Sequence, residues 1–423
     1  MLWKEKPAAD GTVVAPDERL PWPQTTALGL QHVVAMFGST VLAPILMGFD
    51  PNVCVLMSGI GTLIFFAITG GKVPSYLGSS FAFISVVIVA TGYAGKGANG
   101  SIAVALGGII AAGVVYGAIA LVVMATGTRW IERLMPPVVT GSIVAVIGLN
   151  LASIPIKSMA STQFDAWMEL VTFVAIAVVA VFTRGMVRRL LILVGLAIAT
   201  VIYAGLANGL GLGQPVDGTR LASADWLGAP HFTTPVFDAR ALVLIAPVAL
   251  ILVAENLGHL KAVSAMTGRD MDPYLGRAFL GDAIATMASG ALGGTGVTTY
   301  AENIGVMAAT RIYSTALFVI AALFAILLGF SPKFGALIQA IPGAVLGGVS
   351  IVVFGLITIA GARIWVDNKV NFLDSRNMLV AAITLVLGTG DFTLKFGGFA
   401  LGGIGTATFG AILMHAVLSR GRR

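Results

Sequence analysis

The amino-acid sequence predicts an all-α integral membrane protein, and three observations carry this prediction. Of its 423 residues, 57% are hydrophobic and only 10% are charged, with a mean hydropathy of +0.95, whereas a soluble domain carries about 25% charged residues. The chain contains 53 glycines, and small residues are typical of the contacts between membrane helices. Its apolar segments are continuous, whereas the strands of a membrane β-barrel alternate polar and apolar residues.

Apolar runs separated by charged residues, prolines and glycines give fourteen candidate transmembrane segments. In chain order they cover 25–48, 52–70, 79–93, 101–126, 137–153, 166–183, 187–208, 241–262, 276–292, 297–309, 312–330, 343–362, 377–390 and 399–418. The third and tenth are short and polar-rich, and each follows a glycine-rich lead at 70–74 or 290–296. We therefore expect short extended stretches in these two spans.

The distribution of basic residues predicts that both chain ends lie in the cytoplasm. With fourteen spans and an inner N-terminus, 19 of the 25 lysines and arginines fall on the inner side, as the positive-inside rule requires. The remaining six are Lys96, Lys157, Arg220, Arg240, Lys333 and Lys395. This asymmetry accounts for the net charge of +6 without a nucleic-acid partner. The first 20 residues are polar, which argues against a cleaved signal peptide.

The two halves of the chain share a similar segment. Residues 136–146 resemble residues 342–352, although a likeness of this length in an apolar protein can arise by chance. With seven spans in each half, the second half would be inverted relative to the first. Inverted repeats with interrupted helices at corresponding positions are typical of secondary transporters that hold their substrate near the membrane midplane.

Two polar islands within apolar sequence mark the candidate site. Glu255 and His259 are four residues apart, so on a helix they share one face, and Glu302 lies in the tenth span. A charged residue at the centre of a membrane helix costs about 2.5–3.5 kcal/mol on insertion scales. Glu255 and His259 could exchange a proton in a dry site, or they could only tie their span to a neighbour. The pattern lacks the ligands of a zinc site.

The tenth span predicts an arrangement suited to a small, flat, amide-like ligand. If a half-helix begins near Glu302, free backbone N–H groups would point into a cavity beside the carboxylate. Ser80 and Phe81 of the third span would face them with a hydroxyl group and an aromatic ring. Phe81 and Tyr300 could instead be ordinary packing residues.

Four further polar residues in the apolar segments are expected to have structural roles. Gln31 and His32 in the first span and Asn303 beside Glu302 are expected to form hydrogen bonds between spans, and Asp282 is expected to be structural as well.

These residues resemble a known family. The run from Glu302 to Arg311 matches the signature of the nucleobase–ascorbate transporter family, [Gln/Glu/Pro]-Asn-x-Gly-x4-Thr-[Arg/Lys/Gly], and Gln31-His32 matches its first-span pair. The similarity extends over about 28–355 and is greatest to bacterial uracil permeases. Further similar stretches are 35–38, 76–84 and 300–307, whereas 14–21 and 254–261 resemble pyrimidine permeases in particular.

The resemblance implies two inverted seven-span repeats and a division into two domains. A core domain would comprise 25–130 and 240–332, and a gate domain 131–239 and 333–419. The cytoplasmic tails would be 1–24 and 420–423.

The resemblance also implies roles for individual residues. Glu255 and Glu302 would bind the pyrimidine ring, Phe81 and Ala301 would contribute backbone groups, and Tyr300 would line the site. His259 would act with Glu255 in proton coupling. The substrate-binding residues implied in this way are Glu255, Glu302, Phe81, Tyr300, Ala301, Ser80, Ser39 and Phe354. Three positions depart from the family pattern, because Ser39 and Ala301 replace an alanine and a glycine and Phe354 replaces a tyrosine.

The resulting hypothesis is a transporter, not an enzyme, that imports uracil by proton symport with alternating access, with thymine as a second candidate substrate. It would need no cofactor or metal, the proton being the coupling ion. We expect a multi-pass protein of the bacterial inner membrane, in contact with lipid, with a homodimer implied by the resemblance alone. The alternatives are a purine (xanthine or urate) symporter of the same fold, an anion exchanger of similar architecture, an intramembrane enzyme and a channel.

Overall fold

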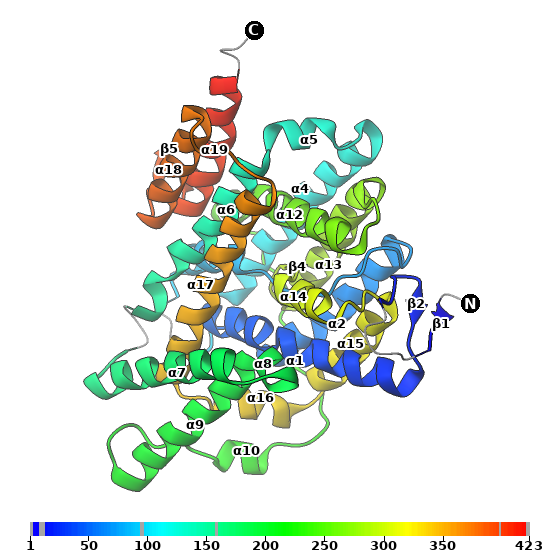
Figure 1. The fold of residues 1–423 in the computed structure, drawn as a ribbon. Helices are drawn as coiled ribbons and strands as arrows, with labels where there is room; N and C mark the ends of the chain where they lie inside the picture. Colours follow the sequence, from blue (N-terminus) through cyan, green and yellow to red (C-terminus); the bar gives the residue numbers. More distant parts are fainter. Residues whose placement is uncertain (1–2, 8–12, 94–96, 157–159, 397–398, 420–423) are drawn as a thin grey trace.

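The computed structural model describes residues 3–7, 13–93, 97–156, 160–396 and 399–419 (Figure 1). Its α-helices are α1 (Trp22–Met47), α2 (Pro51–Ile68), α3 (Ile84–Thr91), α4 (Ile102–Thr126), α5 (Arg129–Leu134), α6 (Pro137–Leu151), α7 (Gln163–Phe182), α8 (Gly185–Arg189), α9 (Leu191–Leu210), α10 (Thr219–Ser223), α11 (Ala239–Ile245), α12 (Val248–Thr267), α13 (Leu275–Ala291), α14 (Ala301–Thr310), α15 (Thr315–Gly329), α16 (Pro332–Gln339), α17 (Gly343–Asp367), α18 (Ser375–Thr389) and α19 (Gly403–Ser419). The strands are β1 (Lys4–Glu5), β2 (Glu18–Arg19), β3 (Leu77–Ser79), β4 (Val297–Thr299), β5 (Leu394–Phe396) and β6 (Phe399–Leu401), and two 3₁₀ turns are η1 (Phe81–Phe83) and η3 (Asp272–Tyr274).

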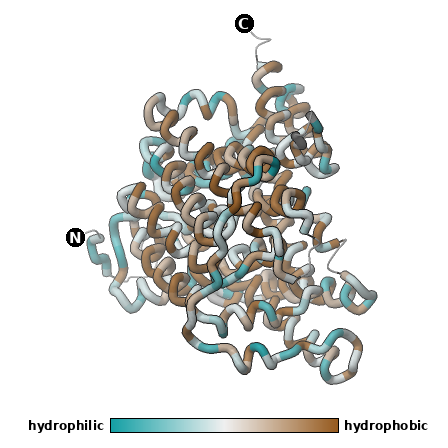
Figure 2. Tube along the Cα trace, turned by 180° about the vertical axis from the view of Figure 1, so that it is seen from behind, coloured by the Kyte–Doolittle hydropathy of each residue, from teal (hydrophilic) through white to brown (hydrophobic). Residues whose placement is uncertain are grey.

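The described residues form an almost entirely helical membrane protein, as the composition predicts. Seven helices are long and apolar enough to span a membrane, or eight if the bent pair α15–α16 counts as one span. Four shorter apolar helices occupy 81–91, 137–151, 375–389 and 403–419. Figure 2 shows that the helices are mostly hydrophobic, whereas the N-terminal segment and the connecting loops carry many of the hydrophilic residues.

Local sequence signals fix several helix ends near the positions expected from the apolar runs. α1 ends at Gly48, whose φ of 73° is a left-handed conformation that glycine adopts without steric cost. Asp50 then starts α2, since its side chain accepts a hydrogen bond from the backbone N–H of Asn52 at 2.8 Å. Asp238 starts α11 in the same way, with bonds from two backbone N–H groups.

The third and tenth spans contain the extended stretches that the sequence predicts. β3 and β4 form an antiparallel pair in which Leu77, Gly78 and Ser79 lie opposite Thr299, Thr298 and Val297. All six residues are buried. Irregular backbone at membrane depth must pair its polar groups inside the protein, and each strand provides this pairing for the other. Helical halves follow both strands, η1–α3 after β3 and α14 after β4.

Close packing of Tyr300 against Gly78 leads to a stability prediction. A Cβ atom at Gly78 would lie 2.6 Å from two ring atoms of Tyr300 and 2.7 Å from Oγ1 of Thr40. We expect Gly78→Ala to lower the free energy of unfolding by about 1–3 kcal/mol, because the ring and strand must shift. Thermal unfolding of purified protein in detergent checks this. The matched control is Gly205→Ala in α9, where a Cβ would meet no atom within 4 Å; equal melting temperatures for the two variants would contradict the prediction.

Helix packing links segments from both halves of the sequence. α4 and α2 pack against α13, and α2 and α1 pack against α15. Elsewhere α6 contacts α17 and α18, α7 contacts α17 and α9, and α18 lies beside α19 (Figure 1). The division into core and gate domains stays a prediction.

A sharp break that the apolar pattern of the sequence does not predict separates α15 from α16. The two helices are bent by 82°. Pro332 occupies the first turn of α16, and the Ser331 side chain accepts a bond from the backbone N–H of Phe334 at 3.3 Å. The sequence interpretation left 331–342 as a connection, which here contains a short helix.

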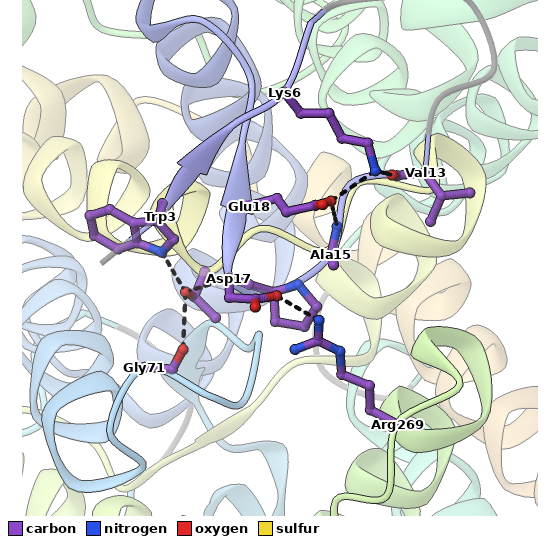
Figure 3. Close-up of polar contacts among 10 residues, drawn as sticks. Trp3, Lys6, Val13, Ala15, Asp17, Glu18, Gly71 and Arg269 are labelled. Carbon is purple, nitrogen blue, oxygen red and sulfur yellow. Dashed lines mark hydrogen bonds and ion pairs between the residues drawn. The ribbon is translucent and has the colours of Figure 1, made fainter. Parts of the chain in front are cut away.

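The described part of the predicted N-terminal tail packs against the body of the protein. The indole N–H of Trp3 donates to Thr315 Oγ1 at 2.8 Å, and Arg269 forms an ion pair of 2.5 Å with Asp17 (Figure 3). Glu18 lies 3.0 Å from the Lys6 ammonium. The backbone N–H of Ala15, which donates to Glu18, and this ammonium lower the pKa of the Glu18 carboxyl. The predicted C-terminal tail, 420–423, lies outside the described residues.

The tail also joins the end of α14. The N–H of Val14 donates to the carbonyl of Arg311 at 3.1 Å, and the carbonyl of Val14 accepts from the N–H of Tyr313 at 2.8 Å. The tail therefore marks the side of the protein toward which α14 runs.

Candidate binding site

Glu302 stands at the junction of an extended strand and a half-helix, as the sequence predicts. It is the second residue of α14, and β4 ends three residues earlier. The first backbone N–H groups of a helix have no partner within it, so this end offers donors beside a carboxylate. The hydroxyl of Ser39, on α1, donates a hydrogen bond to Glu302 Oε1. Ala301 and Glu302 are half-buried.

Glu255 and His259 lie one turn apart on α12 and both face β4. Thr298 Oγ1 lies 3.5 Å from Glu255 Oε2, at the long limit for a hydrogen bond, and His259 Nδ1 lies 2.8 Å from Thr299 Oγ1. Among the described residues no hydrogen bond joins Glu255 directly to His259, so adjacent threonines hold the pair. Helix α12 packs against both β4 and α14. Glu255 and Glu302 therefore come from neighbouring helices.

A buried polar cluster lies beside Glu255, and its centre is Asn256, for which the sequence predicts no role. The Asn256 amide donates to Tyr116 Oη at 2.8 Å and to the Asp282 carboxylate, and it accepts from the hydroxyl of Thr299. Asp282 and Asn256 are almost completely buried. In the described part of the chain, Asp282 Oδ1 has no hydrogen-bond partner. The cluster fixes α12 against β4 and α13, which agrees with the structural role expected of Asp282.

The aromatic residues expected at the site have two kinds of contact. Phe81 packs edge-to-face on Phe354 of α17, with ring centroids 5.8 Å apart, so the position that departs from the family pattern is in direct contact with a predicted site residue. The Tyr300 hydroxyl instead donates to the Ser79 carbonyl at 2.9 Å and accepts from Thr40 Oγ1 at 3.1 Å. These contacts hold Tyr300 against β3 and α1, as expected if Tyr300 is an ordinary packing residue.

Ser80 connects the two extended stretches. Its backbone N–H donates to the carbonyl of Gly296 at 2.8 Å, and its side chain caps η1 by accepting from the N–H of Ala82 at 3.3 Å. This hydroxyl is completely buried in the structure.

The predicted structural polar residues are only partly explained. Asn303 Nδ2 lies 3.0 Å from His32 Nδ1 and donates to the His32 carbonyl at 3.1 Å, which joins α14 to α1 as expected. His32 also packs on the ring of Phe318, with centroids 4.8 Å apart. For Gln31 the predicted hydrogen bond was wrong, since neither polar atom of its buried side-chain amide has a partner among the described residues.

A cavity of about 500 Å³ opens from Glu302 along α14. Its wall includes Gly305, Val306 and Ala309, the successive turns of α14 that lead toward Arg311 and the N-terminal tail. The opposite wall comes from α1, α8, α9 and α17, and the lining residues are Val34, Ala35, Gly185, Arg188, Leu190, Leu191, Ile192, Leu193, Glu302, Gly305, Val306, Ala309 and Leu356. Of the predicted site residues, Glu302 is the one among the described lining residues, and the cavity extends from it along the side of α14 that leads to the tail.

Comparisons with known proteins give one family. A family model described as "Permease family" (Xan_ur_permease) matches residues 23–396. The chain is 66% identical over 419 residues to "Putative pyrimidine permease RutG" of Escherichia coli (strain K12), covering 99% of this chain and 95% of that protein. It is 41% identical over 411 residues to a uracil permease of Paenibacillus larvae, covering 95% of this chain and 96% of that one.

Solved structures with the same fold come from more distant proteins. The transmembrane domain of the cyanobacterial bicarbonate transporter BicA matches with a TM-score of 0.65 at 16% identity, covering 92% of this chain and 97% of that chain. The murine anion transporter Slc26a9, in its inward-facing state, matches with a TM-score of 0.69 at 10% identity, covering 94% and 68%. At these identities the likeness concerns the fold alone.

Proposed function

We propose, from the premise that this chain belongs to the Xan_ur_permease family of permeases, that it imports uracil together with protons. The family resemblance inferred from the sequence is thereby confirmed, and the protein is a multi-pass membrane transporter, not an enzyme. The named relatives include a pyrimidine permease and uracil permeases. Their names support the choice of substrate, and the chemistry of the site supports it independently.

The observation that carries the proposal is the packing of α12, which carries Glu255, against β4 and against α14, whose first turn carries Glu302. Uracil presents two ring N–H donors and two carbonyl acceptors on a flat ring. The carboxylates accept from the ring N–H groups, and the N–H groups at the start of α14 and near Phe81 donate to the carbonyls. Leaving a buried ligand amide unpaired costs about 1–3 kcal/mol, so this set selects a ligand with both kinds of group.

Proton coupling follows from the charge of the same site. Two ionised carboxylates held close together in a partly desolvated site repel one another when no base is bound. A proton held by Glu255 with His259 removes this repulsion and allows the neutral base to bind. Release of the base and the proton on the other side restores the ionised pair, which couples the two movements.

Alternating access requires the site to open to each side in turn, and we assign this movement to the inverted repeat. α6 and α17 both begin immediately after the repeated prolines, Pro136 and Pro342. Gly141 lies against Gly361, and Gly148, further along α6, lies against the carbonyl of Phe354, earlier in α17. The two helices are therefore antiparallel, as expected of corresponding elements in an inverted repeat. In this proposal the fourteen spans form the core (25–130 and 240–332) and the gate (131–239 and 333–419), which move against each other.

The same assignment gives a location and an orientation. We place the protein in the bacterial inner membrane with both termini in the cytoplasm, which makes the tail-side cavity inward-facing. The homodimer in this proposal rests on the family resemblance alone.

Two alternatives keep the fold but change the substrate. A purine symporter would bind a larger ring than a pyrimidine; thymine adds only a methyl group to uracil and stays a second candidate. An anion exchanger shares the architecture of BicA, but Glu255 and Glu302 would repel an anion.

Uptake of labelled uracil by cells that lack other uracil permeases tests the function. We expect saturable accumulation that a protonophore abolishes and that excess unlabelled uracil, but not xanthine or urate, suppresses. Accumulation that survives the protonophore would contradict proton coupling. Suppression by purines with none by pyrimidines would favour the purine symporter.

A further inference from the structure

Among the described residues that line the cavity, Arg188 and Glu302 are the charged ones, and they come from different parts of the chain. Arg188 belongs to the short helix α8, between α7 and α9, whereas Glu302 begins α14. The remaining lining residues are glycine, alanine, valine, leucine and isoleucine. Apolar walls of this kind focus the field of a charge along the cavity.

Arg188 is available to act on the cavity. Its side chain is exposed, and it forms no ion pair with any residue that the structure describes. Gly185, with a φ of 63°, begins α8 in a left-handed conformation, and a Cβ there would meet no atom within 4 Å. On the opposite wall a Cβ at Gly305 would also meet nothing within 4 Å. Open space therefore lies beside both of these cavity-lining glycines.

In the proposed cycle the empty site contains two negative charges, which a nearby cation would stabilise. After the base and the proton leave, Glu255 and Glu302 are both ionised. Among the described residues, the polar groups around them are Ser39 from α1, Thr298 from β4 and, one turn from Glu255, His259. Tyr300 lies at the start of α14, and Asn256 with its partners Tyr116 and Asp282 lies beside Glu255. None of these is a fixed cation. Arg188 is always protonated and is the cation among the lining residues that the structure describes.

We propose that Arg188 is a positioning residue for the release step, whose guanidinium stabilises the ionised carboxylates of the empty site through the tail-side cavity. By this action it favours departure of the proton, and with it the base, into the cytoplasm. The inference rests on the proposed proton-coupled uptake. It also predicts which part of the cycle needs Arg188: net uptake includes deprotonation of the empty site, whereas exchange of one base for another does not.

The test compares net uptake with exchange in right-side-out membrane vesicles whose luminal pH is set. We expect Arg188→Gln to lower the initial rate of proton-driven uracil uptake on the order of tenfold and to leave uracil–uracil exchange unchanged. Raising the luminal pH should restore net uptake, because a higher pH favours the ionised carboxylates without the cation. Arg188→Lys should retain most of the rate. The matched control is Arg184→Gln, an exposed arginine of the same connection that does not line the cavity.

Three outcomes would overturn the inference: equal net uptake by Arg188→Gln and Arg184→Gln, parallel loss of uptake and exchange, or no recovery at high luminal pH. Failure of the proposed function itself is distinguishable, since it appears in the wild-type protein as uptake that does not depend on the proton gradient. That result would remove the basis of this inference too.

Discussion

Replacing Glu302 by alanine should abolish uracil uptake while the protein remains folded in the membrane. Glu302 is half-buried, accepts a hydrogen bond from Ser39 and faces the cavity. Without its carboxylate a ring N–H of the bound base has no acceptor, which costs about 1–3 kcal/mol or more. We therefore expect the apparent affinity to fall at least about tenfold to hundredfold, as measured by initial uptake rates over a range of uracil concentrations.

The control for this prediction is a carboxylate outside the cavity. Asp217 lies in an exposed connection, where its side chain contacts Thr219, so Asp217→Asn should transport normally. Expression and membrane content of each variant are measured by immunoblot. Normal uptake by Glu302→Ala at equal membrane content would show that the site is elsewhere.

Replacing Glu255 should reduce uracil uptake as strongly as replacing Glu302. Two different replacements of Glu255 separate its role in binding the base from its role in proton coupling. Glu255→Ala removes both an acceptor for the base and the proposed proton site, so uptake should be lost. Glu255→Gln resembles a permanently protonated glutamate. It should keep uracil exchange between the two sides of the membrane but lose accumulation driven by a proton gradient.

Counterflow and gradient-driven uptake in the same proteoliposomes measure these two activities. A Glu255→Gln variant that still accumulates uracil against its gradient would contradict the assignment of the proton to Glu255. If the glutamine variant bound uracil but lost both activities, the exchange step itself would require an ionisable Glu255.

The sequence was most informative where membrane burial makes polar residues costly. The segment around Glu302 was predicted to begin a half-helix, and α14 covers Ala301–Thr310. The glycine-rich leads predicted interrupted helices in the third and tenth spans. A strand lies at the start of each span, β3 in the third and β4 in the tenth. These predictions succeed because the bilayer forbids unpaired backbone, so a short polar-rich span has few alternatives.

What the sequence could not provide are contacts between distant segments. β3 and β4 are more than 200 residues apart in the chain, and their pairing depends on how α2 and α13 pack. The same holds for Asn256, whose partners come from α4, α13 and β4. Its position beside Glu255 suggested no role of its own. Arg188 was counted only as one of the basic residues on the inner side, and the folded structure places it on the wall of the cavity that Glu302 also lines.

The central claim is that one nucleobase is held between Glu255 and Glu302, and locating a bound base tests it most directly. Crystals of the protein grown with 5-bromouracil would carry a heavy atom whose anomalous signal marks the ligand. The account predicts a single strong peak between α12 and the start of α14, with both carboxylates within hydrogen-bond distance of the ring. A peak elsewhere, or a map in which either carboxylate turns toward lipid, would contradict it.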